Sequence, residues 1–284
     1  LYNSNWISYS NYLKVNTAVP FFLDRNDTNM ELNTKAIAMD YGWMWQIPLQ
    51  HRWGCGYVFD GNKINETQAK EEIELKLNRK IQSPKTLKFS AGYYDNVWIN
   101  NCIAIGLASG FLEPLQATSI HSTLVQLDLF AYHYFSSDLS NIDFETSPKA
   151  YNKTIGKMWD DFRDLLQIHY ITQREDSEFW KYCKYDLKKT DKVKHVLELS
   201  KYRSPSSWDF DLYHGSATWG VWCWTIYGLD IVSKEAVENT LNNYALMPYA
   251  KETYDKIDYT NKLRSTSIMK NKDFLYELKK KRIT

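Results

Sequence analysis

The stretch GLASGFLEPLQATSI, residues 106–120, separates two parts of the chain that differ in predicted secondary structure. Gly106 and Gly110 permit close approach of the backbone, and Pro114 stops the preceding element. Thr118 begins a predicted helix, whose first amides have no partner inside the helix. Such a helix start attracts an anion, so the stretch predicts an anion-holding turn. An ordinary turn leading into a packed helix is the alternative.

The part before this stretch is predicted to contain strands and one helix. Residues 43–60 predict a β-hairpin, because apolar residues alternate on both sides of a polar turn. Alternation places Trp43, Trp45 and Ile47 on one face of the first strand. A helix is predicted over 65–79, and short strands are predicted at 86–93 and 97–105. Asn65 is the expected N-cap of that helix.

The part after Thr118 is predicted to be almost wholly helical. Ser147 and Pro148 predict an N-cap followed by proline at the first helical position. The next helix carries an apolar stripe of Tyr151, Ile155, Met158, Phe162, Leu165 and His169. We expect His169 to be a packed residue of this stripe and not a ligand. Further helices are predicted around 191–202, 216–227 and 234–244.

These elements predict an α+β chain, with a mixed sheet followed by a largely helical C-terminal region. We expect a sheet-containing portion at 1–135 and a helical portion at 136–284. The 284 residues are 44% hydrophobic, which is enough for a substantial core. The chain begins with Leu1 and has no targeting pattern, which suggests a cut through a longer protein.

Charge and cysteine placement exclude several function classes. The net charge is +1 and the charges of both signs are dispersed, so a nucleic-acid partner is not expected. The basic run at 279–282 is interpreted as a solvated helix end. The longest apolar run, 102–112, is too short to span a membrane. Four widely separated cysteines and six scattered histidines predict a reduced, cytoplasmic chain without a metal site.

Two segments resemble signatures of flavin-dependent halogenases of the tryptophan-halogenase family. GWMWQIP at 42–48 resembles the WxWxIP signature, and residues 106–120 resemble the GLAxGFxEPLExT block. The segments RWGCGYVFD at 52–60 and FSAGYYDNVWINN at 89–101 also resemble the sequence between these motifs, in the same order. The resemblance covers most of 13–135 and implies part of an α/β flavin-monooxygenase-like fold.

The resemblance implies roles for the residues of both motifs. Thr118 and Ser119 would hold the halide through backbone amides, and Leu107 and Ile120 would contact the flavin. The strand residues Trp43, Trp45, Ile47 and Pro48 would line the tunnel between flavin and substrate, with core packing as the alternative for the tryptophans. Trp219 and Trp222, in HGSATWGVWCW at 214–224, would face the arene, and helix packing is again the alternative.

The resemblance also implies cofactors and partners. FAD, supplied in reduced form by a flavin reductase, would use oxygen to convert halide to hypohalous acid, which halogenates an electron-rich aromatic substrate. The GxGxxG fingerprint and the lysine that captures the oxidant would lie upstream of Leu1 and are not in this chain. We therefore expect these residues alone not to bind FAD tightly. A homo-oligomer is compatible with the sequence.

The block departs from the family pattern at its catalytic position. Gln116 stands where the family carries a glutamate, and Ala117 follows where tryptophan-specific members usually carry serine. An amide can hydrogen-bond but cannot carry the negative charge that stabilises a cationic arene. Free tryptophan is therefore not the expected substrate, and a larger arene is favoured. Glu113, the first glutamate of the block, is predicted to be structural.

Two alternative functions remain at this point. Gln116 favours a flavin-dependent monooxygenase on the same scaffold if the charge is needed for halogenation. The high aromatic content, 15% of residues, is also compatible with a non-catalytic protein that binds an aromatic ligand. Product mass in the presence of bromide separates the first alternative from a halogenase.

Overall fold

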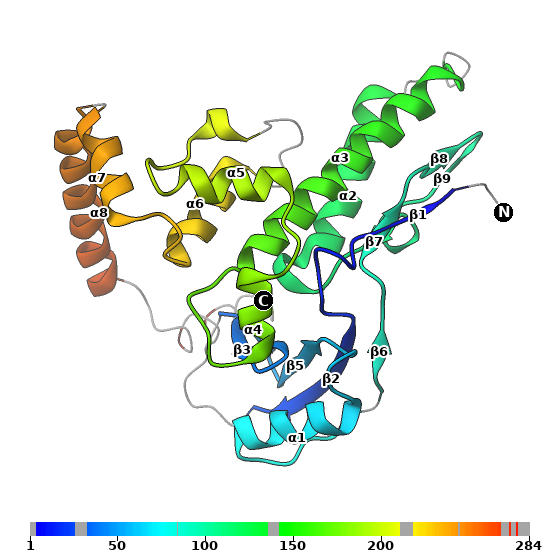
Figure 1. Ribbon diagram of the computed structural model, residues 1–284, viewed down its shortest axis with the longest axis horizontal. Helices are drawn as coiled ribbons and strands as arrows, with labels where there is room; N and C mark the ends of the chain where they lie inside the picture. The colour runs from blue at the N-terminus through cyan, green and yellow to red at the C-terminus, as the bar shows by residue number, and fades with distance from the viewer. Residues whose placement is uncertain are drawn as a thin grey trace.

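The computed structural model describes residues 4–25, 33–83, 85–135, 142–210, 218–243 and 245–267, together with Asp273 and Glu277. Strands occur in the first part of the chain and helices fill most of the second (Figure 1). This arrangement confirms the α+β prediction.

The larger sheet is antiparallel and has five strands in the order β3-β4-β5-β2-β6. Its strands are β2 (Thr17–Asp24), β3 (Lys35–Met39), β4 (Gly42–Pro48), β5 (Arg52–Phe59) and β6 (Leu87–Lys88). β4 and β5 form the predicted hairpin, with Gly42 opposite Phe59 and Pro48 opposite Trp53. The register places successive side chains of β4 on opposite faces of the sheet.

Both faces of this sheet are covered. Met44 packs on one face with Ala69 and Ile73 of α1 (Glu66–Leu77), which lies along the sheet in Figure 1. Trp43 packs on the other face, in a cluster that includes Trp180 of α4 (Glu178–Tyr185). The alternation predicted for β4 therefore separates two different cores.

Helix α1 begins at the predicted residue. The Asn65 side chain accepts a hydrogen bond from the Gln68 amide at 3.0 Å, and the Gln68 side chain accepts one from the Asn65 amide at 2.9 Å. This capping box satisfies two amides that the helix itself cannot bond. The helix ends at Asn78, whose φ of 48° is left-handed.

The strands predicted at 86–93 and 97–105 are interrupted in the structure, so the prediction of two continuous strands is wrong. The first is split because the chain leaves the larger sheet after β6 and joins a three-stranded sheet of β1 (Trp6–Ser8), β7 (Gly92–Tyr94) and β10 (Gly110–Phe111). The second folds back on itself at Asn100, whose φ is 52°. It forms the hairpin of β8 (Trp98–Ile99) and β9 (Cys102–Ile103).

Helix α3 (Thr146–His169) runs beside α2 (Thr118–His133), as Figure 1 shows. The predicted apolar stripe of α3 is confirmed, since its members at 151, 155, 158, 162 and 165 are all buried. Most of them form one core with the loop before β2 and the strands β7 and β8. This core holds α3 against the strand-containing part of the chain.

The predicted start of α3 is wrong by a few residues. The helix begins at Thr146 with Glu145 as N-cap, not at Pro148 after Ser147. The side chain of Asp143 accepts hydrogen bonds from the amides of Glu145, at 2.9 Å, and Thr146, at 3.3 Å, so these amides are satisfied before Ser147 is reached. Pro148 fits within the first turn, because amides there have no helical partner to lose.

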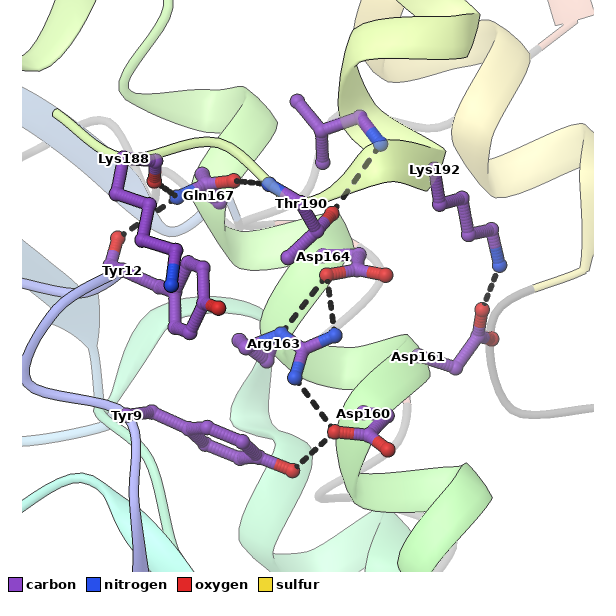
Figure 2. A network of polar contacts seen from close by, with 11 residues as sticks. Tyr9, Tyr12, Asp160, Asp161, Arg163, Asp164, Gln167, Lys188, Thr190 and Lys192 are labelled. Atoms are coloured by element: carbon purple, nitrogen blue, oxygen red, sulfur yellow. Dashed lines mark hydrogen bonds and ion pairs between the residues drawn. The ribbon is translucent and has the colours of Figure 1, made fainter.

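A polar cluster joins α3 to the N-terminal segment (Figure 2). The Arg163 guanidinium pairs with Asp160 at 2.5 Å and with Asp164 at 2.8 Å. The Tyr9 hydroxyl donates a hydrogen bond of 2.8 Å to Asp160 Oδ1, the same oxygen that pairs with Arg163. Asp164 is almost completely buried, and its charge is therefore stabilised by the guanidinium rather than by water.

The remaining helices are α5 (Asp191–Leu199), α6 (Trp219–Gly228), α7 (Lys234–Asn243) and α8 (Met247–Ser267). Helices α5 and α7 lie within the ranges predicted for them, and α6 ends one residue beyond its range, whereas no range was predicted for α4 or α8. Trp222 and Ile226 of α6 pack on Leu165 and Ile168 of α3. The basic run at 279–282 lies outside the described residues. Among the helices that the structure describes, none combines the length and the apolar character needed to cross a membrane.

Candidate functional site

The turn predicted at 106–120 consists of short irregular elements. Gly106 begins a 3-10 helix, η1 (Gly106–Ala108), with a φ of 62°, and a side chain there would lie 3.0 Å from Thr123 Oγ1. The left-handed backbone therefore favours glycine, and the close Thr123 hydroxyl would have to shift to admit a Cβ. Strand β10 follows, and a second 3-10 turn, η2 (Leu115–Ala117), leads directly into α2.

Two consecutive residues before α2 have left-handed backbones. Gln116 has φ 61° and ψ 9°, and Ala117 has φ 51° and ψ 34°. Residues with a Cβ avoid this region, at a cost of roughly 1–2 kcal/mol each. Such strain is concentrated at functional sites, where the surrounding structure holds it in place.

The start of α2 has no side-chain cap, because its N-cap residue is Ala117. Thr118 is the first helical residue; it is buried, and its hydroxyl has no hydrogen-bond partner. A buried hydroxyl without a partner is costly, and the unpaired amides of a helix start favour negative charge. Ser119 follows and is half-buried. These features are compatible with the halide role predicted for Thr118 and Ser119.

Glu113 links the turn to the tryptophan-bearing strand β4. Its Oε1 accepts hydrogen bonds from the Trp43 indole N–H, at 3.2 Å, and from the Tyr170 hydroxyl, at 2.7 Å. The carboxyl is completely buried and its Oε2 has no partner. Burial therefore raises the pKa of Glu113 to about 7, against the lowering effect of the two bonds. The same pairing and burial raise the pKa of Tyr170.

Gln116 contacts the C-terminal end of α3. Its side-chain nitrogen lies 2.8 Å from Nε2 of His169, and Nδ1 of His169 lies 2.7 Å from the Leu165 carbonyl oxygen. Gln116 is exposed, whereas His169 is half-buried. Burial lowers the pKa of His169, and the Leu165 carbonyl partly offsets this effect. Gln116, which the sequence predicts to occupy the catalytic position of the block, therefore has a hydrogen-bonded neighbour on another element.

The predicted flavin and tunnel residues differ in exposure. Leu107 and Ile120 are each 70% exposed, an unusual environment for large apolar side chains. Trp43 is buried and Trp45 is half-buried, with ring centroids 5.9 Å apart, while Ile47 and Pro48 lie further along the strand toward solvent. Trp45 lies against Gly56 of β5, where a Cβ would be 2.1 Å from its ring.

Trp219 and Trp222 of α6, the two tryptophans predicted to face the arene, belong to a different part of the molecule. Trp222 is completely buried, packs against Phe210 with centroids 5.2 Å apart, and lies under the Lys192 ammonium at 5.0 Å. Trp219 is 47% exposed. Residues 214–217, the start of the predicted substrate segment, lie outside the described residues. In the described part of the chain, no three His, Cys, Asp or Glu side chains are grouped to hold a metal ion.

Comparison with known proteins identifies the family of this chain. The family model described as tryptophan halogenase matches residues 2–242, which is most of the chain. The chain belongs to the tryptophan halogenase family. It is 32% identical over 184 residues to the tryptophan 7-halogenase KtzQ of Kutzneria sp. (strain 744), covering 63% of this chain and 34% of that protein. It is 30% identical over 279 residues to the tryptophan 7-halogenase RebH of Lentzea aerocolonigenes, covering 93% of this chain and 50% of that protein.

Solved structures have the same fold. A tryptophan halogenase of Shewanella frigidimarina superposes with a TM-score of 0.84 at 22% identity, over 96% of this chain and 52% of that one. The chain therefore spans about half of the length of RebH and of this structure, and a third of KtzQ. The resemblance inferred from the two motifs is confirmed at the level of family and fold.

The tryptophan halogenase motifs alone did not reveal three contacts of the turn. Glu113 was predicted to be structural, but not to connect the two motifs. His169 was predicted to be a packed residue, and Tyr170 was not singled out. The signal available in the sequence was weak: a histidine and a tyrosine at the end of a long helix, more than fifty residues from the turn.

Proposed function

We propose that this chain is the halide-side and substrate-side portion of an FAD-dependent halogenase that acts on an electron-rich arene. The observation that carries the proposal is the uncapped start of α2, where the buried Thr118 hydroxyl has no partner after two left-handed residues. The proposal assigns the halide to the amides of Thr118 and Ser119. Membership of the tryptophan halogenase family supports this assignment.

The residues of the turn fit a flavin and a halide. Leu107 and Ile120, near the two ends of the 106–120 stretch, have exposed apolar side chains, which suits contact with a flat aromatic cofactor. FAD, when bound, supplies the oxidation of halide by oxygen. The GxGxxG fingerprint and the oxidant-capturing lysine are assigned to sequence outside this chain, and a flavin reductase is the proposed source of reduced FAD.

The chain's own residues contribute separation and placement. Trp43 and Trp45 are proposed to form the wall that keeps substrate from the flavin, and Glu113 fixes Trp43 through its indole N–H. Gln116 is proposed to face the reactants as an uncharged group. Trp219 is the proposed arene contact of α6. Trp222 is completely buried, and its proposed role is to pack in the core beneath α6. The portions 1–135 and 136–284 are proposed as the flavin-side and substrate-side regions.

Product analysis with the complete protein tests the proposal. The protein is supplied with FAD, a flavin reductase, oxygen and bromide, with indole as the arene. A halogenase gives a product carrying one bromine, recognisable by its paired isotope masses. A product with one added oxygen would establish the monooxygenase alternative, and binding of indole without any product would establish the non-catalytic alternative.

Two substitutions connect the outcome to the turn. Thr118→Val removes the unpartnered hydroxyl while keeping the shape, and is expected to raise the bromide concentration required for half-maximal rate. Gln116→Glu restores the charge of the family motif and is expected to increase bromination of indole. An unchanged or lower rate for Gln116→Glu would show that the amide does not account for the departure from the family pattern.

A further inference from the structure

The C-terminal end of α3 contacts the turn at two adjacent residues. His169 bonds the Gln116 amide, and Tyr170 donates to Glu113, three residues earlier in the turn. Tyr170 is itself fixed, because its ring stacks on Trp180 with centroids 5.8 Å apart. The end of α3 is therefore a firm support for the catalytic position, reached from a distant part of the sequence.

The two hydrogen-bond partners of His169 determine which of its ring nitrogens carries a hydrogen. The Leu165 oxygen is a backbone carbonyl and can only accept, so Nδ1 of His169 must carry a hydrogen. A neutral imidazole then has a lone pair at Nε2. The Gln116 group at 2.8 Å from Nε2 must consequently be the N–H₂ end of the amide, which donates.

The surroundings of His169 favour this neutral form. Burial lowers its pKa, and the one opposing effect comes from the Leu165 carbonyl. Neither effect comes from a charged side chain among the described residues. The imidazole therefore acts as a hydrogen-bond acceptor toward the turn.

We propose that His169 is a positioning residue for Gln116, holding its amide nitrogen so that the carbonyl oxygen points away from α3 as an uncharged acceptor for the reactants. The two polar atoms of an amide share one carbon and point in different directions, so fixing one orients the other. The bond also supports the left-handed backbone of Gln116. The assignment of Oε1 to the reactants rests on the proposed function; the orientation of the amide does not.

Nitrogen NMR of the complete protein with ¹⁵N-labelled histidine tests the orientation directly. The resonances of His169 are identified by their loss in His169→Gln. In the unsubstituted protein at neutral pH, Nδ1 is expected to be protonated and Nε2 unprotonated. A hydrogen on Nε2 in place of Nδ1 would overturn the proposal.

Gln116→Glu provides the matched comparison. Glutamate has no N–H to donate, so Nε2 must take up a proton to keep the bond, and His169 is expected to become an imidazolium at neutral pH. The exposed His195 of α5 is the internal control, and its signals should be the same in both proteins. An unchanged His169 spectrum in Gln116→Glu would show that the two side chains do not interact, which would also overturn the proposal.

Kinetics tests the consequence for the reaction. His169→Phe keeps a ring but removes the acceptor, and is expected to lower kcat about tenfold with little change in KM, as for the loss of one hydrogen bond. His169→Gln can accept the same bond through its carbonyl and is expected to recover most of the rate. Equal rates for all three proteins would overturn the positioning role. If the unsubstituted protein forms no halogenated product, the proposed function fails, and the NMR result still decides the orientation.

Discussion

Replacing Glu113 by glutamine isolates the effect of one buried carboxyl on stability. The pKa of Glu113 rises from 4.5, its ordinary value, to about 7 in the folded protein because the group is buried and its Oε2 has no partner. The folded protein thus binds a proton more tightly than the unfolded chain does. A difference of one in pKa corresponds to about 1.4 kcal/mol, so the protonated carboxyl contributes about 3 kcal/mol relative to the ionised one.

The sign of the pH dependence follows from linkage. This contribution is fully present below pH 4.5 and is lost as the pH rises through about 7, because the folded state binds the extra proton only between these values. Glu113→Gln keeps an acceptor for Trp43 and Tyr170 but does not titrate. The free energy of unfolding of the unsubstituted protein, minus that of Glu113→Gln, is therefore expected to fall by about 3 kcal/mol across this range.

Urea unfolding followed by tryptophan fluorescence measures this difference. Both complete proteins are unfolded at half-unit pH intervals between 4.5 and 8 at constant ionic strength, and the subtraction removes the titration of all other groups. A difference that stays constant over this range would refute the reasoning, since the buried carboxyl would then titrate as it does in the unfolded chain. A difference that grows with pH would refute it as well, because it would require a lowered pKa.

Two further substitutions test the framework around the site. Asn152→Ala leaves two buried backbone amides at 97–98 without their acceptor, so thermal unfolding should show a loss of about 2 kcal/mol or more, and a loss below half of that would contradict the role of the side chain. Gly56→Ala would place a Cβ 2.1 Å from the Trp45 ring, so we expect a loss of about 1–3 kcal/mol and a shifted Trp45 environment. Gly54→Ala on the same strand meets its nearest neighbour at 3.6 Å and should be nearly neutral; equal effects at both positions would exclude the ring contact as the cause.

The parts of the fold that were predicted correctly are those with a local cause. The hairpin of β4 and β5 follows from alternation, the start of α1 from the capping side chain of Asn65, and the buried stripe of α3 from helical spacing. The strand predicted at 97–105 was interrupted by a local turn at Asn100, whereas the one predicted at 86–93 was interrupted for a non-local reason. The segment 86–93 changes sheets, and this depends on partners in β1 and β2 that periodicity does not reveal.

Helix α2 shows how spacing can predict a helix without predicting its buried face. The apolar residues Ile120, Leu124 and Leu127 follow helical spacing, yet they are exposed, and Thr118, Ser122 and Gln126 are buried instead. Both sets recur at helical intervals, so periodicity alone cannot decide which of them faces the core. The buried position of Thr118, on which the halide proposal depends, therefore required the structure.

The site residues were predicted individually, whereas their connections were not. The motifs identified Trp43 and Gln116, but the groups that hold them are Glu113, Tyr170 and His169, and the last two come from the end of a helix assigned to the other half of the chain. Side-chain hydrogen bonds across such distances in sequence leave no periodic pattern. They depend on where α3 ends relative to the turn, which the packing of its whole stripe determines.

The amide at position 116 and the neutral imidazole at position 169 are chemically matched. A carboxylate at 116 would face the lone pair of Nε2, because Nδ1 must keep its hydrogen for the Leu165 carbonyl. Such a pair is repulsive unless the half-buried His169 takes up a second proton, which burial disfavours. Gln116 avoids this conflict by donating. The glutamine at position 116, where the family motif carries glutamate, is therefore matched to the neutral form of His169. The rate of Gln116→Glu should be interpreted together with the charge of His169, measured in the same protein.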